Sequence, residues 1–208
     1  MRKIVVTTFM SLDGVMQAPG GAGEDPSGGF DQEGWSVNYW DDRMGEEMGA
    51  FMTPPFDLLL GRKTYEIFAA YWPQASDELG AGPLNAATKY VISTTLSSVD
   101  WQPSVLIGTD VVAHISRLKQ QDGPDLQVHG SSVLLQTLIA HDLVDEFHLL
   151  IFPLLLGRGK RLFGDGAIPA GLRLVRSETS TTGVVIATYA RAGEIKLGTF
   201  AAEQPTDT

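Results

Sequence analysis

The feature that most constrains the fold is a repeated alternation of short apolar runs with amphipathic segments. Ile4 to Phe9 is rich in β-branched and aromatic residues and is followed by Asp13-Gly14, a pattern typical of a buried strand and a turn. Strands are expected at residues 4–9, 56–60, 90–92, 105–107, 126–129, 147–152, 172–180 and 184–190. Strands that alternate with helices form largely parallel sheets through right-handed crossovers.

The intervening segments predict helices. From Trp40 to Met52 apolar residues recur at helical spacing, with Asn38 as the expected N-cap and Pro54-Pro55 as the end. Further helices are expected at residues 61–72, 111–120 and 131–140. After Asp145 the expected elements are all strands, and Thr182-Gly183 predicts a tight hairpin. The sequence therefore predicts a three-layer α/β fold with a mixed, mostly parallel sheet of about eight strands and an antiparallel C-terminal hairpin.

The domain organisation follows from where these patterns stop. The 208 residues contain no linker-like segment and no sign of a second hydrophobic core, so residues 1–191 are expected to form a single domain. Beyond Ala192 the periodicity fades, and residues 192–208 are expected to be a mobile C-terminal tail.

Charge and cysteine content narrow the partners and the compartment. The net charge of −10 opposes binding to nucleic acid or to an anionic membrane surface. The chain has no cysteine, and its apolar runs are too short for a signal peptide or a membrane span, so a cytoplasmic protein is expected.

Three strand-to-helix turns carry groups that suit a phosphorylated ligand. Gly61-Arg62-Lys63-Thr64 offers free N–H groups at a helix start together with two cations. Gly130-Ser131-Ser132 offers small residues, and Ser93-Thr94 offers hydroxyls. Each turn is equally compatible with plain helix capping. Because all three follow strands expected in one parallel sheet, where ligands bind at the carboxyl edge, together they predict a nucleotide site.

The order of several short motifs resembles the dihydrofolate reductase-like proteins, and more closely the reductase domain of the riboflavin-pathway deaminase-reductase and its stand-alone relatives. The resemblance covers roughly Lys3 to Arg191. The motifs that carry it are Ser11-Leu12-Asp13-Gly14, Leu58-Leu59-Leu60-Gly61-Arg62-Lys63-Thr64-Tyr65-Glu66, Val91-Ile92-Ser93-Thr94, Val128-His129-Gly130-Ser131 and Asp145-Glu146 through Pro153-Leu154-Leu155-Leu156-Gly157-Arg158-Gly159.

This resemblance implies NADPH as the cofactor. It implies adenosine phosphates near Ser93-Thr94 and the Gly61 turn, a pyrophosphate at the start of the helix near Gly130, and a nicotinamide near residue 8 and residues 15–17. The implied cofactor-binding residues are Thr8, Val15, Met16, Gln17, Gly61, Arg62, Lys63, Thr64, Ser93, Thr94, Gly130, Ser131, Ser132 and Val133. Arg62 and Lys63 favour NADPH over NADH, because a 2′-phosphate needs charge-assisted donors.

The substrate side departs from the family pattern, since the loop from Gly20 to Gly34 is long and the following helix carries several acids. On a helical wheel Asp41 falls on the apolar arc, Glu47 falls beside Phe51, and the other acids point away. Asp41 is the first choice for a catalytic acid and Glu47 the second. The alternative is that these carboxylates have no catalytic role and only stabilise the helix dipole.

A basic loop and the histidines are the remaining candidates for a functional role. The loop Gly157 to Phe163 is glycine-rich and basic, and it suits either a substrate phosphate or a solvated turn. The four histidines show no metal-like spacing and no obvious carboxylate partner, so no metal site is expected.

The functional expectation is an NADPH-dependent reductase that transfers a hydride to a small heterocycle resembling a pterin or a pyrimidine. The alternatives are a non-catalytic nucleotide- or ligand-binding protein on the same scaffold, and the riboflavin-pathway 5-amino-6-(5-phosphoribosylamino)uracil reductase. The resemblance also implies a homodimer, built by the apolar strands at residues 147–156 and 184–190, which would bury an exposed sheet edge.

Overall fold

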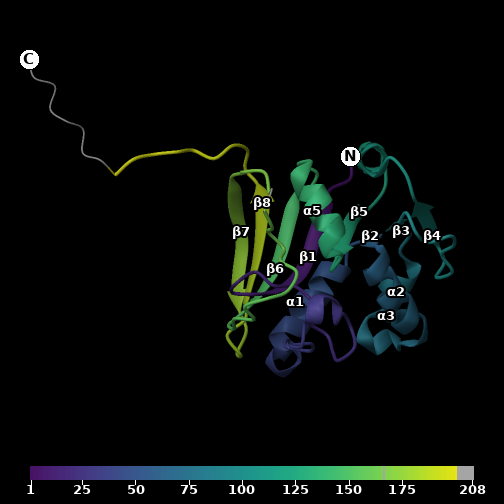
Figure 1. The fold of residues 1–208 in the computed structure, drawn as a ribbon, viewed down its shortest axis with the longest axis horizontal. Helices are drawn as coiled ribbons and strands as arrows, with labels where there is room; N and C mark the ends of the chain where they lie inside the picture. Colours follow the sequence, from purple (N-terminus) through teal and green to yellow (C-terminus); the bar gives the residue numbers. More distant parts are fainter. Residues whose placement is uncertain (166, 201–208) are drawn as a thin grey trace, which may run out of the picture.

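A computed structural model describes residues 1–165 and 167–200 of the chain. Its centre is one eight-stranded sheet in the order β4-β3-β2-β5-β1-β6-β8-β7, which Figure 1 shows from β7 at the left to β4 at the right. The strands are β1 Ile4–Ser11, β2 Phe56–Gly61, β3 Lys89–Ile92, β4 Ser104–Ile107, β5 Asp125–His129, β6 Glu146–Phe152, β7 Leu172–Thr179 and β8 Val185–Arg191. β1 to β6 pair in parallel, whereas β8 is antiparallel to both β6 and β7. The predicted fold class is confirmed.

Within the described residues, five α-helices pack on this sheet: α1 Asp42–Met52, α2 Arg62–Tyr71, α3 Ala81–Ala86, α4 Val111–Gln120 and α5 Ser132–Ala140. Short 3₁₀ segments lie between β1 and α1, at Ser27–Gly29 and Val37–Tyr39, and between α2 and α3, at Trp72–Gln74 and Asp77–Leu79. None of the helices in the described part of the chain is long and apolar enough to cross a membrane.

The two faces of the sheet are buried differently. On one face α4 and α5 cover a single large core that includes Val6 of β1, Val128 of β5 and Leu149 of β6. On the other face α2 and α3 pack over β2 and β3, and α1 packs over β6 and β8. These form two separate apolar clusters, around Leu58 and around Leu150 respectively, so the second face has a division across its middle.

Two local predictions are wrong. Asn38 does not cap α1, because it lies in the 3₁₀ segment Val37–Tyr39, and the cap is Asp41, whose side chain accepts the Met44 N–H. The predicted helix therefore begins two residues late, at Asp42. Helix α3, which contains a glycine and a proline, was not predicted at all.

The exposed edge of the sheet also differs from the expectation. The strands that were expected to bury an edge, β6 and β8, are both interior. The two edge strands are β4 and β7, and β7, the edge next to β8, has Leu172 and Leu174 exposed. The chain from Ala192 to Phe200 contains no helix or strand, although Gly171 pairs with Ala192 and Gly193 through backbone hydrogen bonds. The remainder of the expected tail, residues 201–208, lies outside the described residues.

Candidate functional site

Two of the three predicted strand-to-helix turns are bonded to each other. The Ser131 hydroxyl accepts the Gly61 N–H at 3.0 Å, and the Ser131 N–H donates to the Thr64 hydroxyl at 2.8 Å. The Ser131 hydroxyl in turn donates to the His129 carbonyl at 2.8 Å. Because β2 and β5 are adjacent strands, these contacts hold the N-termini of α2 and α5 side by side. First-turn N–H groups of two helices thus converge on one place, the arrangement that suits an anion.

The backbone at this place has no room for larger residues. Gly130 and Ser131 both have positive φ, 51° and 55°, and a Cβ added at Gly130 would lie 3.0 Å from the Thr64 hydroxyl. The close approach of the two turns therefore depends on glycine at 130. The resulting turn is tightly packed and internally bonded, and helix N–H groups remain at its outer side.

The polar side chains around these turns differ in exposure. Arg62 and Lys63 are exposed at the start of α2, and Arg62 is only loosely paired with Glu66, at 3.8 Å. Ser132 is partly exposed, and the apolar side chain of Val133 is 76% exposed on the first turn of α5. Cations and an apolar side chain are thus free to contact a nucleotide at the joined turns.

The third predicted turn, at Ser93-Thr94, uses its buried hydroxyl to stabilise the loop that follows β3. Ser93 is buried, and its hydroxyl accepts the N–H groups of Thr95 and Leu96 at 3.2 and 3.0 Å. Thr94 is exposed beside it. Of this pair, only Thr94 offers a free-standing side chain to a ligand.

The residues expected near a nicotinamide have buried side chains. Val15 and Met16 are part of hydrophobic clusters, and Thr8 faces the α4–α5 side of the sheet by strand alternation. The Gln17 amide donates to the carbonyls of Asp25 and Ser27 and accepts the Lys160 N–H. In this structure the side chain of Gln17 acts as a clamp for two loops.

A line of polar side chains fills the division on the second face of the sheet. It consists of Thr7 on β1, Gln127 and His129 on β5, and His148 on β6, which we call the polar strip. Thr7 is the cross-strand neighbour of both His129 and His148. Phe51 of α1 stacks on His148 with ring centres 4.1 Å apart, and Phe68 of α2 lies 6.2 Å from His129. The strip thus lies between α1 and α2, and α2 begins at one of the two joined turns.

Hydrogen bonds orient most of the strip. Gln127 donates to the Phe51 carbonyl at 2.7 Å, which leaves its side-chain oxygen to accept from His129 Nε2 at 3.0 Å. Burial, and secondarily the charge of His148, lowers the pKa of His129 to about 4. His129 is therefore neutral at physiological pH, as expected for a desolvated imidazole.

His148 has the carboxylate partner that the sequence did not reveal. Its Nε2 lies 2.9 Å from Glu146 Oε1, two residues along the same strand. The hydrogen bond with His148, together with the nearby Lys3, lowers the pKa of Glu146 despite partial burial. The expectation that the histidines have no carboxylate partner is therefore wrong for His148. Residues i and i+2 of a strand lie on the same face of the sheet, so Glu146 is within reach of His148 once both are in one strand.

Asp41 is bonded on both carboxylate oxygens. One accepts the Met44 N–H at 2.9 Å, and the other accepts both the N–H and the hydroxyl of Thr181 at 2.7 Å. These bonds, with Thr181 first, lower the pKa of Asp41. The side chain thus caps α1 and fastens it to the β7–β8 turn.

Glu47 is buried, as its place on the apolar arc predicts, with 3% exposure. It pairs with Arg176 of β7 and with Arg43 at 3.1 Å, and its Oε2 has no hydrogen-bond partner. It is therefore a buried carboxylate with one free oxygen, and it lies one helical turn from Phe51.

The basic loop near Gly157 is extensively paired with acids. Arg158 contacts Asp31 and Lys160 contacts Asp25, both at 2.6 Å, and Arg161 contacts Asp13 at 3.5 Å. A cavity of about 270 Å³ lies between this loop and the long N-terminal loop, lined by Gln17, Ser27, Gly28, Phe30, Arg158, Gly159 and Lys160. Because the cations are neutralised by acids of the chain, the loop offers little net charge to a phosphate.

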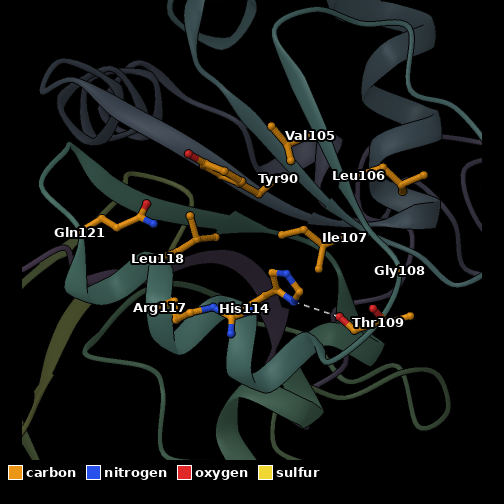
Figure 2. A pocket seen from close by; sticks show the side chains of 10 residues that line it. All are labelled: Tyr90, Val105, Leu106, Ile107, Gly108, Thr109, His114, Arg117, Leu118 and Gln121. Carbon is orange, nitrogen blue, oxygen red and sulfur yellow. Dashed lines mark hydrogen bonds between the residues drawn. The ribbon is translucent and has the colours of Figure 1, made fainter.

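A second cavity of about 280 Å³ lies on the α4 side of β3 and β4, as Figure 2 shows. Its lining includes Tyr90, Ile107, His114 and Arg117, and the His114 ring is held by the Thr109 carbonyl at 3.1 Å. None of the residues predicted to bind the cofactor lines it.

Sequence reasoning missed the polar strip. The sequence does contain a signal, which is the presence of polar residues inside apolar predicted strands. Gln127 and His129 interrupt the strand at residues 126–129, and Thr7 and His148 interrupt the strands at residues 4–9 and 147–152. Only the strand order reveals that these interruptions are neighbours.

Residues 2–186 match the family described as the RibD C-terminal domain. The chain is 29% identical over 194 residues to the uncharacterized protein YyaP of Bacillus subtilis (strain 168), covering 90% of this chain and 94% of that protein. A Shewanella sp. PV-4 protein named for riboflavin biosynthesis has a similar structure, with a TM-score of 0.62, 22% identity, and 91% and 99% of the two chains covered. Dihydrofolate reductase from Enterococcus faecalis, complexed with NADP(H) and RAB-propyl, gives a TM-score of 0.55 at 16% identity, with 91% and 96% covered. By the match over nearly its whole length, the chain belongs to the RibD C-terminal domain family, on the fold of dihydrofolate reductase.

Proposed function

We propose that this protein is an NADPH-dependent reductase that transfers a hydride to a small heterocycle resembling a pterin or a pyrimidine. The observation that carries the proposal is the joining of the β2–α2 and β5–α5 turns through Ser131 beside a buried polar strip. An anion site and a site for a flat polar ring then lie next to each other on one sheet. The family match and the NADP(H) complex of the similar dihydrofolate reductase support the cofactor.

The residues present fit a dinucleotide phosphate. The glycine at 130 allows the backbone to approach closely, and the first-turn N–H groups at Ser132 and Val133 suit the pyrophosphate. Arg62 and Lys63 suit the 2′-phosphate, with Thr94 within the same row of turns. When bound, the cofactor supplies a hydride to a C=N or C=O carbon.

The remaining chemistry falls to the chain. The heteroatom of the reduced bond must gain a proton, for which Asp41 and Glu47 remain the proposed donors. The lowered pKa of Asp41 opposes this role, because an ionised carboxylate has no proton to give. Glu47 has an unpartnered Oε2 for such a contact, but it is paired with Arg43 and Arg176, so it would have to take up a proton before it could donate one.

The experiment that tests the proposal is a fluorescence titration of the full chain with NADPH, followed by NADPH oxidation with a panel of pterins, pyrimidines and quinones. Binding with turnover of one member supports a reductase. Tight binding without turnover on any would instead favour a non-catalytic nucleotide-binding protein, and failure to bind NADPH would contradict the reductase and leave the ligand-binding alternative.

A further inference from the structure

We propose that His148 binds the polar edge of the substrate ring through Nδ1, with the Thr7 hydroxyl as the adjacent contact, and that Glu146 positions the imidazole. This inference rests on the proposed function and deepens it. It specifies a substrate ring in which an N–H stands next to a carbonyl, as in pyrimidinones and pterins.

The first support is a pair of unsatisfied buried atoms. Among the described residues, three buried side-chain atoms lack any hydrogen-bond partner: Thr7 Oγ1, Glu47 Oε2 and His148 Nδ1. Thr7 and His148 are direct cross-strand neighbours on β1 and β6, and Thr7 is only 2% exposed. Buried polar groups are nearly always paired, so two orphans side by side indicate a missing partner.

The second support is that the His148 ring is held in place without using Nδ1. Nε2 is bonded to Glu146, and the face of the ring stacks on Phe51 at an interplanar angle of 26°. An ionised Glu146 accepts the Nε2–H, so in the neutral form of the ring the lone pair lies at Nδ1. The carboxylate thus selects which nitrogen can accept a hydrogen bond.

The third support is the pattern of donors and acceptors. Nδ1 accepts and the Thr7 hydroxyl can donate, a pair that complements a ring N–H next to a carbonyl oxygen. In the rest of the strip, the Gln127 amide is bonded on both sides, to the Phe51 carbonyl and to His129 Nε2. Phe51 and Phe68, both partly exposed, border the strip and suit the faces of a flat ring.

The test uses the wild-type chain with ¹⁵N-labelled histidine, in the presence of NADP⁺, and follows the ring nitrogens by NMR. Uracil and pterin are the probes, and 1,3-dimethyluracil, which retains both carbonyls but has no ring N–H, is the matched control. We expect uracil or pterin to shift the His148 Nδ1 signal while it keeps the character of an unprotonated nitrogen. The dimethyl compound should leave it unchanged.

Variants then separate contact from structure. We expect His148→Gln and Thr7→Val each to weaken probe binding by about tenfold or more. Glu146→Gln should weaken it and allow the ring to change tautomer, seen as exchange of the two nitrogen signals. His114→Gln, which removes a histidine from the other face, is the control and should bind the probe normally.

The outcomes are distinguishable. Equal shifts with uracil and 1,3-dimethyluracil, or unchanged affinity in a folded His148→Gln protein, would overturn the proposal, and so would the absence of any probe effect on wild type. If NADPH binds and turns over but the His148 signals never respond, this inference fails while the proposed function stands. If NADPH itself does not bind, the proposed function fails, and a probe shift at His148 would still assign a ring-binding site.

Discussion

The hydroxyl of Thr64, on the first turn of α2, accepts the backbone N–H of Ser131 at 2.8 Å. Ser131 holds a left-handed conformation, so this bond also fixes a backbone that an L-residue adopts reluctantly. We expect Thr64→Val to leave that buried N–H unpaired, to destabilise the fold by about 1–3 kcal/mol, and to weaken NADPH binding by about tenfold. Urea unfolding and a fluorescence titration measure the two effects. Thr64→Ser retains the hydroxyl and should restore both, and equal losses in the two variants would contradict the role of the bond.

Arg62 and Lys63 are expected to set the cofactor preference. Because a charge-assisted contact contributes about 1.5–3 kcal/mol, NADPH should bind at least tenfold more tightly than NADH. Arg62→Ala should reduce that ratio by weakening NADPH alone. Parallel titrations with the two cofactors test this, with Arg173→Ala, on the distant strand β7, as the control. An unaltered ratio in Arg62→Ala would remove Arg62 from the cofactor site.

Two variants of Asp41 distinguish a role in capping α1 from a role in catalysis. Asn keeps the cap on the Met44 N–H, but its NH2 group cannot accept from Thr181. Asp41→Asn should therefore lower the free energy of unfolding by about 1 kcal/mol, Asp41→Ala should lower it further, and NADPH affinity should be unchanged in both. Proton delivery by Asp41 requires that turnover fall by about 10²-fold in the Asn variant. Unfolding curves and steady-state rates give the comparison. Full turnover in Asp41→Asn would assign the residue to capping and leave Glu47 or water as the donor.

The buried His129 predicts how stability depends on pH. Its pKa of about 4 in the folded state lies below the ordinary value of 6.5, so between these values the unfolded chain binds the proton first. Stability from this residue is full above pH 6.5 and is lost as the pH falls toward 4, by about 2 kcal/mol between pH 7 and pH 5. Urea unfolding at the two pH values should show a smaller difference in His129→Gln than in wild type. The exposed His141→Gln is the control, and an identical pH dependence in His129→Gln would contradict the assignment.

The edge strand β7 is the proposed site of homodimer formation. Leu172, Leu174 and Val175 are exposed on it, and an unpaired apolar edge favours association with a second copy. Light scattering should give about twice the 22.4 kDa chain mass at micromolar concentration. We expect Leu174→Lys to shift the protein to monomer, while Leu197→Lys, on the exposed C-terminal segment, should not. A monomer in wild type would refute the dimer.

Much of the fold could be predicted from the sequence because its strands are continuous apolar runs bounded by turn residues, and most of its helices have regularly spaced apolar residues. The helix Val111–Gln120, for example, has the predicted bounds. Helix α3 could not be predicted, because Gly82 and Pro83 oppose helix formation and the helix is held by tertiary packing of Ala81 and Leu84. The edge strand was misassigned for a related reason: strand order is a property of the whole sheet, and no local pattern encodes it.

The site was predictable where it depends on backbone turns and not where it depends on side chains that meet across strands. The turns at Gly61 and Gly130 are marked by small residues, and the structure brings them together. Whether they hold NADPH stays a prediction. The four residues of the polar strip come from three strands that are distant in sequence, so their proximity follows only from the strand order.

The unequal burial of the two sheet faces has a consequence for how such a chain can change over time. The continuous core under α4 and α5 provides most of the apolar packing, and it contains none of the four strip residues. On the proposed function, substitutions at positions 7 and 148 would alter which ring the molecule binds, while the larger core continues to specify the fold. Ligand preference and the main apolar core would then depend on different residues, so this scaffold could acquire a new specificity through few mutations.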